Sequence, residues 1–287
     1  MYLKKNKVNS LLKHSLVLFL LLGLASCSIE KRIAKDFVKT PDKGSVLLFT
    51  PDFMFKSSLK IDSVENALQY SEEQIDSILY AQSIFLKEVS DSILLSRMVN
   101  NYIAAMEAYG FDVYTQEHID RFMQRDDSLY TVNMAQVELE EYVYEYRDEE
   151  YLNGNTYYTD VDLNAVNLNA WFEINMVNSK TKEKNKVLFT SHFLSDDLYG
   201  QFTQSFATGE VKYDYRIDSM NVQDIYELAS YLGKVYANYT LDYIMNKLIR
   251  RNIDMSEYKP DYLHYDPRRN TLNPLYNEEN RFIEMDE

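Results

Sequence analysis

Residues 166–176 read VNLNAWFEINM, and an apolar residue stands at every second position of this stretch. Such alternation is typical of a β-strand that buries one face and exposes the other. The same period appears before it, over residues 129–146, and after it, over residues 187–193. The polar segment 178–185, NSKTKEKN, is turn-like, so the last two runs should pair as a hairpin. Together these segments predict an antiparallel meander. Its central strand should bury Val166, Leu168, Ala170, Phe172, Ile174 and Met176.

Two long segments on either side of the meander carry apolar residues at intervals of three and four, which predicts helices. The first covers residues 71–109, and Gly110 follows it as a C-cap. The second covers residues 222–251, where Arg250 and Arg251 suit the negative end of the helix dipole.

Short strands are predicted before and after the first helix, at residues 46–49 (VLLF) and 111–114 (FDVY), with a short helix at 117–123. If the two strands are parallel, the helix between them forms a right-handed crossover. We therefore predict an α/β (α+β) fold, in which a mixed sheet with an antiparallel meander packs against two long helices.

The amino terminus has the layout of an export signal. Four lysines lie within the first 13 residues, and an uncharged, largely apolar run follows them. That run covers about eleven residues, well short of the roughly 20 that a membrane-spanning helix needs. We expect residues 1–26 to be a signal peptide.

The segment Leu24-Ala25-Ser26-Cys27 resembles the lipobox of bacterial lipoproteins, of the type found in Bacteroidetes envelopes. In that family the thiol is alkylated with a lipid and the peptide bond before it is cleaved. Cys27 is the only cysteine of the chain, and a thiol is nucleophilic enough to form the thioether. The resemblance implies that Cys27 is lipidated and anchors the mature chain in a membrane. The alternative is an ordinary secretory signal followed by an incidental buried cysteine.

The residues after Cys27 bear on location. Ser28 is not aspartate, which by resemblance to the sorting rule of enteric bacteria implies the outer membrane. No acidic run follows the cysteine, and in Bacteroidetes such a run accompanies surface display. We expect the periplasmic face of the outer membrane, with surface exposure as the alternative.

The rest of the chain divides by composition. Residues 27–44 carry mixed charges, a proline and a glycine, and are interpreted as a lipidated tether. Residues 45–255 are interpreted as a single α/β domain. Residues 256–287 hold three prolines, several tyrosines and an acidic end, and are expected to run as an extended tail over the body.

Charge and composition exclude several classes of partner. Without residues 1–26 the chain has 26 basic and 45 acidic side chains, a net charge near −19. Nucleic acid and anionic lipid headgroups are poor partners for such a surface. We therefore expect no nucleic acid, and membrane contact through the lipid anchor alone. The chain also has 25 tyrosines, which indicate either a recognition surface or half-exposed structural positions.

The order of elements over residues 45–251 is similar to that of three kinds of envelope protein. These are the curli secretion lipoprotein, the auxiliary lipoproteins of ABC transport systems and the amino-terminal domain of TolB. The closest local match is Tyr109-Gly110-Phe111-Asp112-Val113. This resemblance implies an assembly or transport accessory rather than an enzyme.

A search for catalytic patterns identifies no site and no cofactor motif. Three histidines, His118, His192 and His264, are far apart and are interpreted as lone imidazoles. The sequence contains no Gly-x-Ser-x-Gly elbow and no phosphate-binding loop. Among the acidic pairs, Asp196 and Asp197 fall in a predicted loop and are the best metal candidates, although solvated surface is the usual role of such pairs.

A short motif, Asp-Ser followed by an aliphatic residue or Met, recurs five times, where composition predicts about one match to its general form. It resembles the O-glycosylation signal of the Bacteroidetes envelope, which implies modification of at least one serine. The alternative is that Asp-Ser caps helices and turns. The serines are Ser63, Ser77, Ser92, Ser128 and Ser219.

Three classes of function remain open. The first is a non-enzymatic, membrane-anchored interaction or assembly protein with an envelope protein as its partner. The second is a glycan- or peptide-binding module that uses a tyrosine-lined groove formed with the tail. The third is a carboxylate-dependent hydrolase, which would need two carboxylates about 5 to 9 Å apart in a pocket.

Overall fold

The computed structural model describes residues 28–177, 186–253 and 260–285. The chain forms two compact units instead of the single domain predicted. Unit 1 contains the described residues up to Pro41 together with those between Leu241 and Tyr276, and unit 2 contains the rest. Both helices and a mixed sheet with antiparallel strands are present, so the predicted fold class is confirmed.

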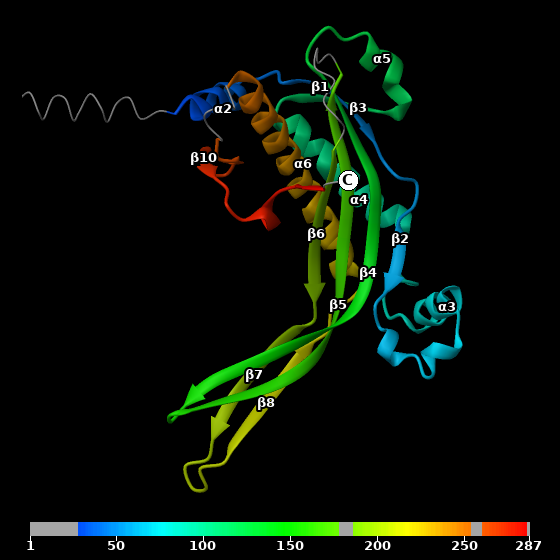
Figure 1. The fold of residues 1–287 in the computed structure, drawn as a ribbon, viewed down its shortest axis with the longest axis vertical. Coiled ribbons are helices and arrows are strands. Elements are labelled where there is room, and N and C mark those ends of the chain that lie inside the picture. The colour runs from blue at the N-terminus through cyan, green and yellow to red at the C-terminus, as the bar shows by residue number, and fades with distance from the viewer. Residues whose placement is uncertain (1–27, 178–185, 254–259, 286–287) are drawn as a thin grey trace, which may run out of the picture. The chain divides into compact units, whose positions relative to one another are not determined.

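Unit 2 is built on a seven-stranded mixed sheet in the order β11-β6-β5-β4-β1-β3, with β2 also paired to β4 (Figure 1). Strand β1 runs parallel to β3 and β4, whereas β4, β5 and β6 pair antiparallel. The predicted meander is confirmed, and the two short strands predicted before and after the first helix are parallel. The strands are β1 Gly44–Phe49, β2 Phe55–Ser58, β3 Phe111–Thr115, β4 Leu129–Leu152, β5 Asn155–Met176, β6 Val187–Ser195 and β11 Ile283–Met285. The turn predicted at residues 178–185 lies outside the described residues.

The alternation of apolar and polar residues in the sequence corresponds to alternating buried and more exposed positions along β5. Leu168, Ala170 and Phe172 are fully buried. In β4 the register shifts between Met134 and Gln136, and this irregularity keeps apolar side chains on the buried face on both sides of it.

The helices of unit 2 differ from the prediction in one place. The segment 71–109 is two helices, α3 Glu72–Gln82 and α4 Asp91–Ala108, separated by residues 83–90. Gly110 has φ +94° and its amide donates to Glu107, so the predicted C-cap is confirmed. Shorter helices are α5 Ile119–Met123 and the 3-10 turns η1 Ile61–Ser63, η2 Ala67–Gln69, η3 Gln116–His118 and η4 Glu278–Asn280.

The second long helix, α6 Val222–Asn252, is confirmed, and it supplies residues to both units. Within unit 2 it approaches α4 closely, because a Cβ on Gly233 would lie 2.2 Å from the carbonyl oxygen of Met98. The buried hydroxyl of Tyr102 donates to Thr240 Oγ1 at 3.0 Å.

Unit 1 corrects the prediction for both ends of the chain. Residues 29–39, expected as a tether, form helix α2 Ile29–Lys39, which buries Ala34 and Phe37 and packs on β9 and β10. Residues of the predicted tail form the antiparallel hairpin β9 Leu263–Asp266 and β10 Thr271–Pro274.

The end of the predicted tail belongs to unit 2. Its Phe282 is buried against Phe172, with ring centroids 4.8 Å apart, and β11 pairs with β6. The tail is therefore part of both cores rather than an extended cover. Among the described residues, no helix is long and apolar enough to cross a membrane.

Candidate functional site

The candidate site begins where β4 and β5 extend beyond the other strands of the sheet. β6 pairs with β5 only from Ala165 onward, so residues 142–164 continue as a two-stranded ribbon. A second hairpin, β7 Asp197–Gln204 with β8 Val211–Asp218, lies beside this ribbon (Figure 1). We call the ribbon and the hairpin, residues 142–164 and 197–218, the arm.

The two hairpins of the arm are joined by their inner faces. Tyr213 of β8 donates its hydroxyl to Asp148 Oδ2 of β4 at 2.7 Å, and the ring of Phe202 packs on Tyr157 of β5. The Tyr213 side chain crosses Gly200, where a Cβ would lie 1.8 Å from its hydroxyl oxygen. Burial and the neighbouring carboxylate of Asp148 raise the pKa of Tyr213 to about 12.

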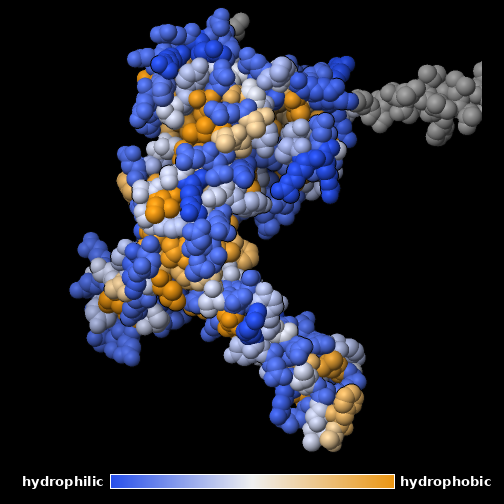
Figure 2. Space-filling model, turned by 180° about the vertical axis from the view of Figure 1, so that it is seen from behind, coloured by the Kyte–Doolittle hydropathy of each residue, from blue (hydrophilic) through white to orange (hydrophobic). Residues whose placement is uncertain are grey.

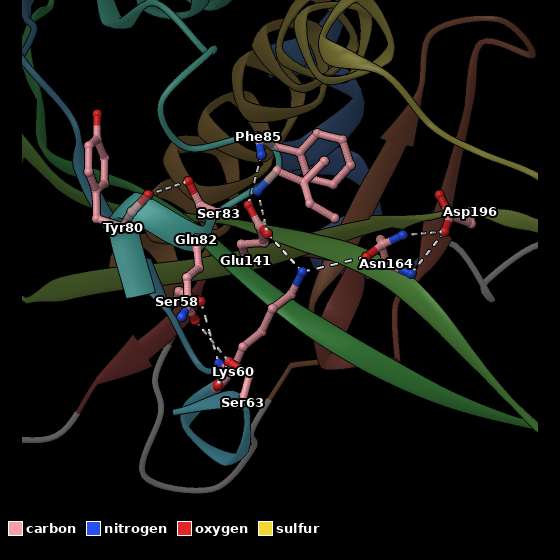
Figure 3. Close-up of polar contacts among 11 residues, drawn as sticks. Ser58, Lys60, Ser63, Tyr80, Gln82, Ser83, Phe85, Glu141, Asn164 and Asp196 are labelled. Atoms are coloured by element: carbon pink, nitrogen blue, oxygen red, sulfur yellow. Dashed lines mark hydrogen bonds and ion pairs between the residues drawn. The ribbon is translucent and has the colours of Figure 1, made fainter. Parts of the chain in front are cut away.

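Asp196 fixes the root of the arm, directly before β7. It is almost fully buried, and its Oδ2 accepts hydrogen bonds from the backbone and side-chain nitrogens of Asn164 at 2.9 and 3.0 Å (Figure 3). Its Oδ1 accepts from the Met220 amide at 2.9 Å. The two oxygens of Asp196 therefore tie β5 to the segment before α6, which is a structural role and differs from both the solvated surface expected of such acidic pairs and the metal site for which Asp196 was a candidate. Within the described residues, no three acidic, histidine or cysteine side chains gather as a metal site would require.

A second buried carboxylate holds β4 at the same root. Glu141 is fully buried, and it accepts from Lys60 Nζ at 2.8 Å and from the amides of Ile84 and Phe85 at 3.0 and 2.9 Å (Figure 3). Burial alone would raise the pKa of Glu141, but the two amides and the ammonium group outweigh burial and lower it. Lys60 Nζ also lies 3.5 Å from Asn164 Oδ1, so the two buried carboxylates share one polar network.

A groove of about 770 Å³ opens where the root of the arm meets the first turns of α6. Its carboxylates are Asp197, Asp218, Asp224 and Glu227, and among the described residues no Lys, Arg or His lines it. Its apolar surface comes from Leu194, Met220, Leu228 and the exposed ring of Tyr231. The groove is therefore acidic and amphipathic.

The outer surface of the arm exposes aromatic rings. Phe206 in the β7–β8 turn is completely exposed, and hydrophobic residues mark the end of the arm in Figure 2. More than half of the surface of each of four tyrosines is accessible. They are Tyr151, Tyr158, Tyr199 and Tyr215.

Two arginines lie over tyrosine rings on the arm, each with a carboxylate beside it. Arg147 lies 4.7 Å from the centre of the Tyr158 ring and bonds Asp160 at 2.7 Å. Arg216 lies 5.1 Å from the centre of the Tyr199 ring, and its nearest carboxylate, Asp218, is at 3.8 Å. The arm surface thus holds guanidinium groups between a ring and a carboxylate.

The histidines fall in three different settings. His118 is exposed beside Thr115, and half-buried His192 lies among aromatic rings, where burial lowers its pKa. The interpretation of His264 as a lone imidazole is wrong, because its Nδ1 lies 2.6 Å from Oδ2 of the fully buried Asp242.

The carboxylate of Asp242 also accepts from the Tyr265 amide at 2.9 Å, and the pair lies within unit 1. Burial raises the pKa of Asp242 to about 6, and the carboxylate raises that of His264. The two residues are 22 positions apart, so no local motif connects them.

The five serines of the Asp-Ser motif are all exposed. Ser219 lies in the groove. Two of the aspartates have structural partners: Asp91 pairs with Lys56 at 2.8 Å, and Asp127 bonds Ser45 at 2.8 Å. Exposure permits glycosylation of the serines, and the contacts supply a structural reason for Asp91 and Asp127. The predicted signal peptide and Cys27 lie outside the described residues.

No protein-family model matches this chain, and no curated protein matches its sequence. Its function is therefore argued from the geometry of the arm and the groove.

Proposed function

We propose that this chain is a lipid-anchored envelope lipoprotein that acts as a non-enzymatic interaction protein and uses the arm to dock on another envelope protein. The exposed aromatic surface of the arm carries this proposal. The inner rings, such as Phe202 and Tyr213, hold the two hairpins together. The outer rings, such as Tyr158 and Phe206, are exposed to solvent. Aromatic rings are the side chains most enriched at the centre of protein interfaces.

The root of the arm supports the same function. Two buried carboxylates, Asp196 and Glu141, join the arm's first residues to α6 and to the segment before α4. A rigid surface loses little conformational entropy when it binds, so its contacts contribute more of their energy to affinity. The anchor proposed at Cys27 would hold this surface at the periplasmic face of the outer membrane.

The test is site-specific photo-crosslinking in the living cell. A photoreactive amino acid at Tyr158 or Phe206 should capture one defined envelope protein. Met123, which is also exposed and lies in unit 2 but outside the arm, is the matched control position. The same product from position 123, or none from either arm position, would count against docking through the arm. Protease added to intact cells tests the location, since a surface-displayed chain would be digested.

A further inference from the structure

We infer that the partner presents a segment rich in arginine, and that an arginine side chain of this segment enters the groove beside Tyr231. This inference rests on the proposed function, because it names the chemistry of the partner that docks on the arm. The docking surface is acidic throughout. The arm has ten acidic and three basic side chains. The groove adds Asp224 and Glu227 from α6, with no basic residue in its lining.

Two of the groove carboxylates face each other. Asp197 and Asp218 occupy directly opposite positions of the β7–β8 pair, where like charges destabilise a hairpin. Among the described residues, the cation paired with them is Arg216, whose guanidinium lies 3.8 Å from Asp218 and is 73 % exposed. Asp224, by contrast, accepts from the Asn221 amide and caps α6. A bound cation would relieve the repulsion between Asp197 and Asp218.

The lining fits an arginine better than a small cation. Besides its carboxylates the groove offers Leu194, Leu228 and the ring of Tyr231, which is 58 % exposed. These surfaces would pack against the methylene groups of a long basic side chain while the carboxylates meet its charged end. Its volume of about 770 Å³ exceeds the needs of a single metal ion and is open enough for several side chains.

Two arginines of the arm already lie between a tyrosine ring and a carboxylate. Arg147 lies over Tyr158 beside Asp160, and Arg216 lies over Tyr199. Tyr231 and Glu227 are one helical turn apart on α6 and line the same groove, so they offer the same combination of ring and carboxylate. Among the described residues, no cation lies over the Tyr231 ring. The partner's arginine would complete this third site.

The experiment measures binding of a fluorescent nona-arginine peptide to the mature chain by anisotropy, with nona-lysine and nona-glutamate as reference probes. We expect arginine to bind more tightly than lysine, because only its planar guanidinium stacks on a ring. The double substitution D197N/D218N should weaken arginine binding at least about fivefold, which corresponds to about 1 kcal/mol for the two solvent-accessible charge contacts together. The substitution Y231L should remove the preference for arginine over lysine.

A matched control keeps the charge change and moves it away from the groove. E117Q/D120N removes two exposed carboxylates from η3 and α5 and should leave arginine binding within twofold. Equal weakening by both double variants, or an unchanged preference in Y231L, would overturn the inference, because either result indicates attraction by net charge alone. If crosslinks from Tyr158 persist in D197N/D218N cells while nona-arginine does not bind, the arginine inference fails and the docking proposal stands.

Discussion

The most demanding test of the fold concerns the buried pair at the root of the arm. In the substitution E141Q the amide keeps the shape of the carboxylate, but its NH2 group would face donors. The Ile84 amide, the Phe85 amide and Lys60 Nζ all donate to Glu141 within 3.0 Å. Breaking a buried ion pair by removing one partner costs about 3 to 5 kcal/mol. For a unit of this size that corresponds to a fall in Tm of roughly 6 to 20 °C.

The assay uses Trp171, the only tryptophan, which lies in β5 and therefore reports on unit 2. Its fluorescence followed against urea gives the free energy of unfolding of E141Q and of two comparison variants. E140Q changes the neighbouring, more accessible carboxylate and should cost less than about 1 kcal/mol. K60M/E141Q removes both charges, so it should be more stable than E141Q alone.

The pH dependence of the free energy of unfolding tests the role of the Glu141 carboxylate independently. The folded-state pKa of Glu141 lies below its ordinary value, so the unfolded chain takes up the proton first as the pH falls. The stability that Glu141 contributes is therefore present above about pH 4.3 and is lost below it. E141Q should lack this part of the acid dependence. Equal unfolding energies for E141Q and E140Q would refute the reasoning.

Four further predictions follow from the structure and the sequence. G200V should push the Tyr213 ring, which belongs to the same hairpin, away from residue 200 and break its hydrogen bond to Asp148, so spectrophotometric titration should show the pKa of Tyr213 falling from about 12 toward 10; an unchanged titration would contradict the close contact. The pKa values of Asp242 and His264 are both raised, so the folded pair binds extra protons and unit 1 should lose stability as the pH rises from the ordinary carboxyl pKa of 3.8 through about 6 and past the raised pKa of His264, a dependence that the double substitution D242N/H264Q should remove in thermal unfolding. C27S should abolish incorporation of labelled palmitate, and retained labelling would exclude lipidation of this residue. The intact mass should exceed that of polypeptide plus lipid if any Asp-Ser site is glycosylated, whereas equality would exclude the modification.

The candidate site was only partly predictable. The sequence singled out the tyrosines, for which a groove under the tail was one of the alternatives, and Asp196 and Asp197, which were the best metal candidates although solvated surface was the expected role of such pairs. The β7–β8 hairpin was missed, although residues 198–204 and 211–217 alternate around a Thr208-Gly209 turn. Gly200 and Gln204 interrupt the apolar set of that hairpin, and only the contact with Tyr213 explains why a glycine stands there.

Local sequence patterns by themselves determined the antiparallel meander, the helix α6 and the two short strands before and after the first predicted helix, whereas the parallel pairing of those two strands was decided by the tertiary structure. In each case the buried face repeats at a spacing that the backbone geometry imposes, so neighbours in the sequence carry enough information. The signal-like amino terminus and the lone Cys27 are likewise readable without a structure, and they remain predictions.

Tertiary structure alone decided the break between α3 and α4 and the pairing of Asp242 with His264. The break occurs because the buried carboxylate of Glu141 accepts the amides of Ile84 and Phe85. Helix α2, by contrast, has apolar residues at intervals of three and four that the tether interpretation overlooked, and only its packing on β9 and β10 required the structure. Contacts between distant segments supply the free energy for these features, and no local pattern encodes such contacts.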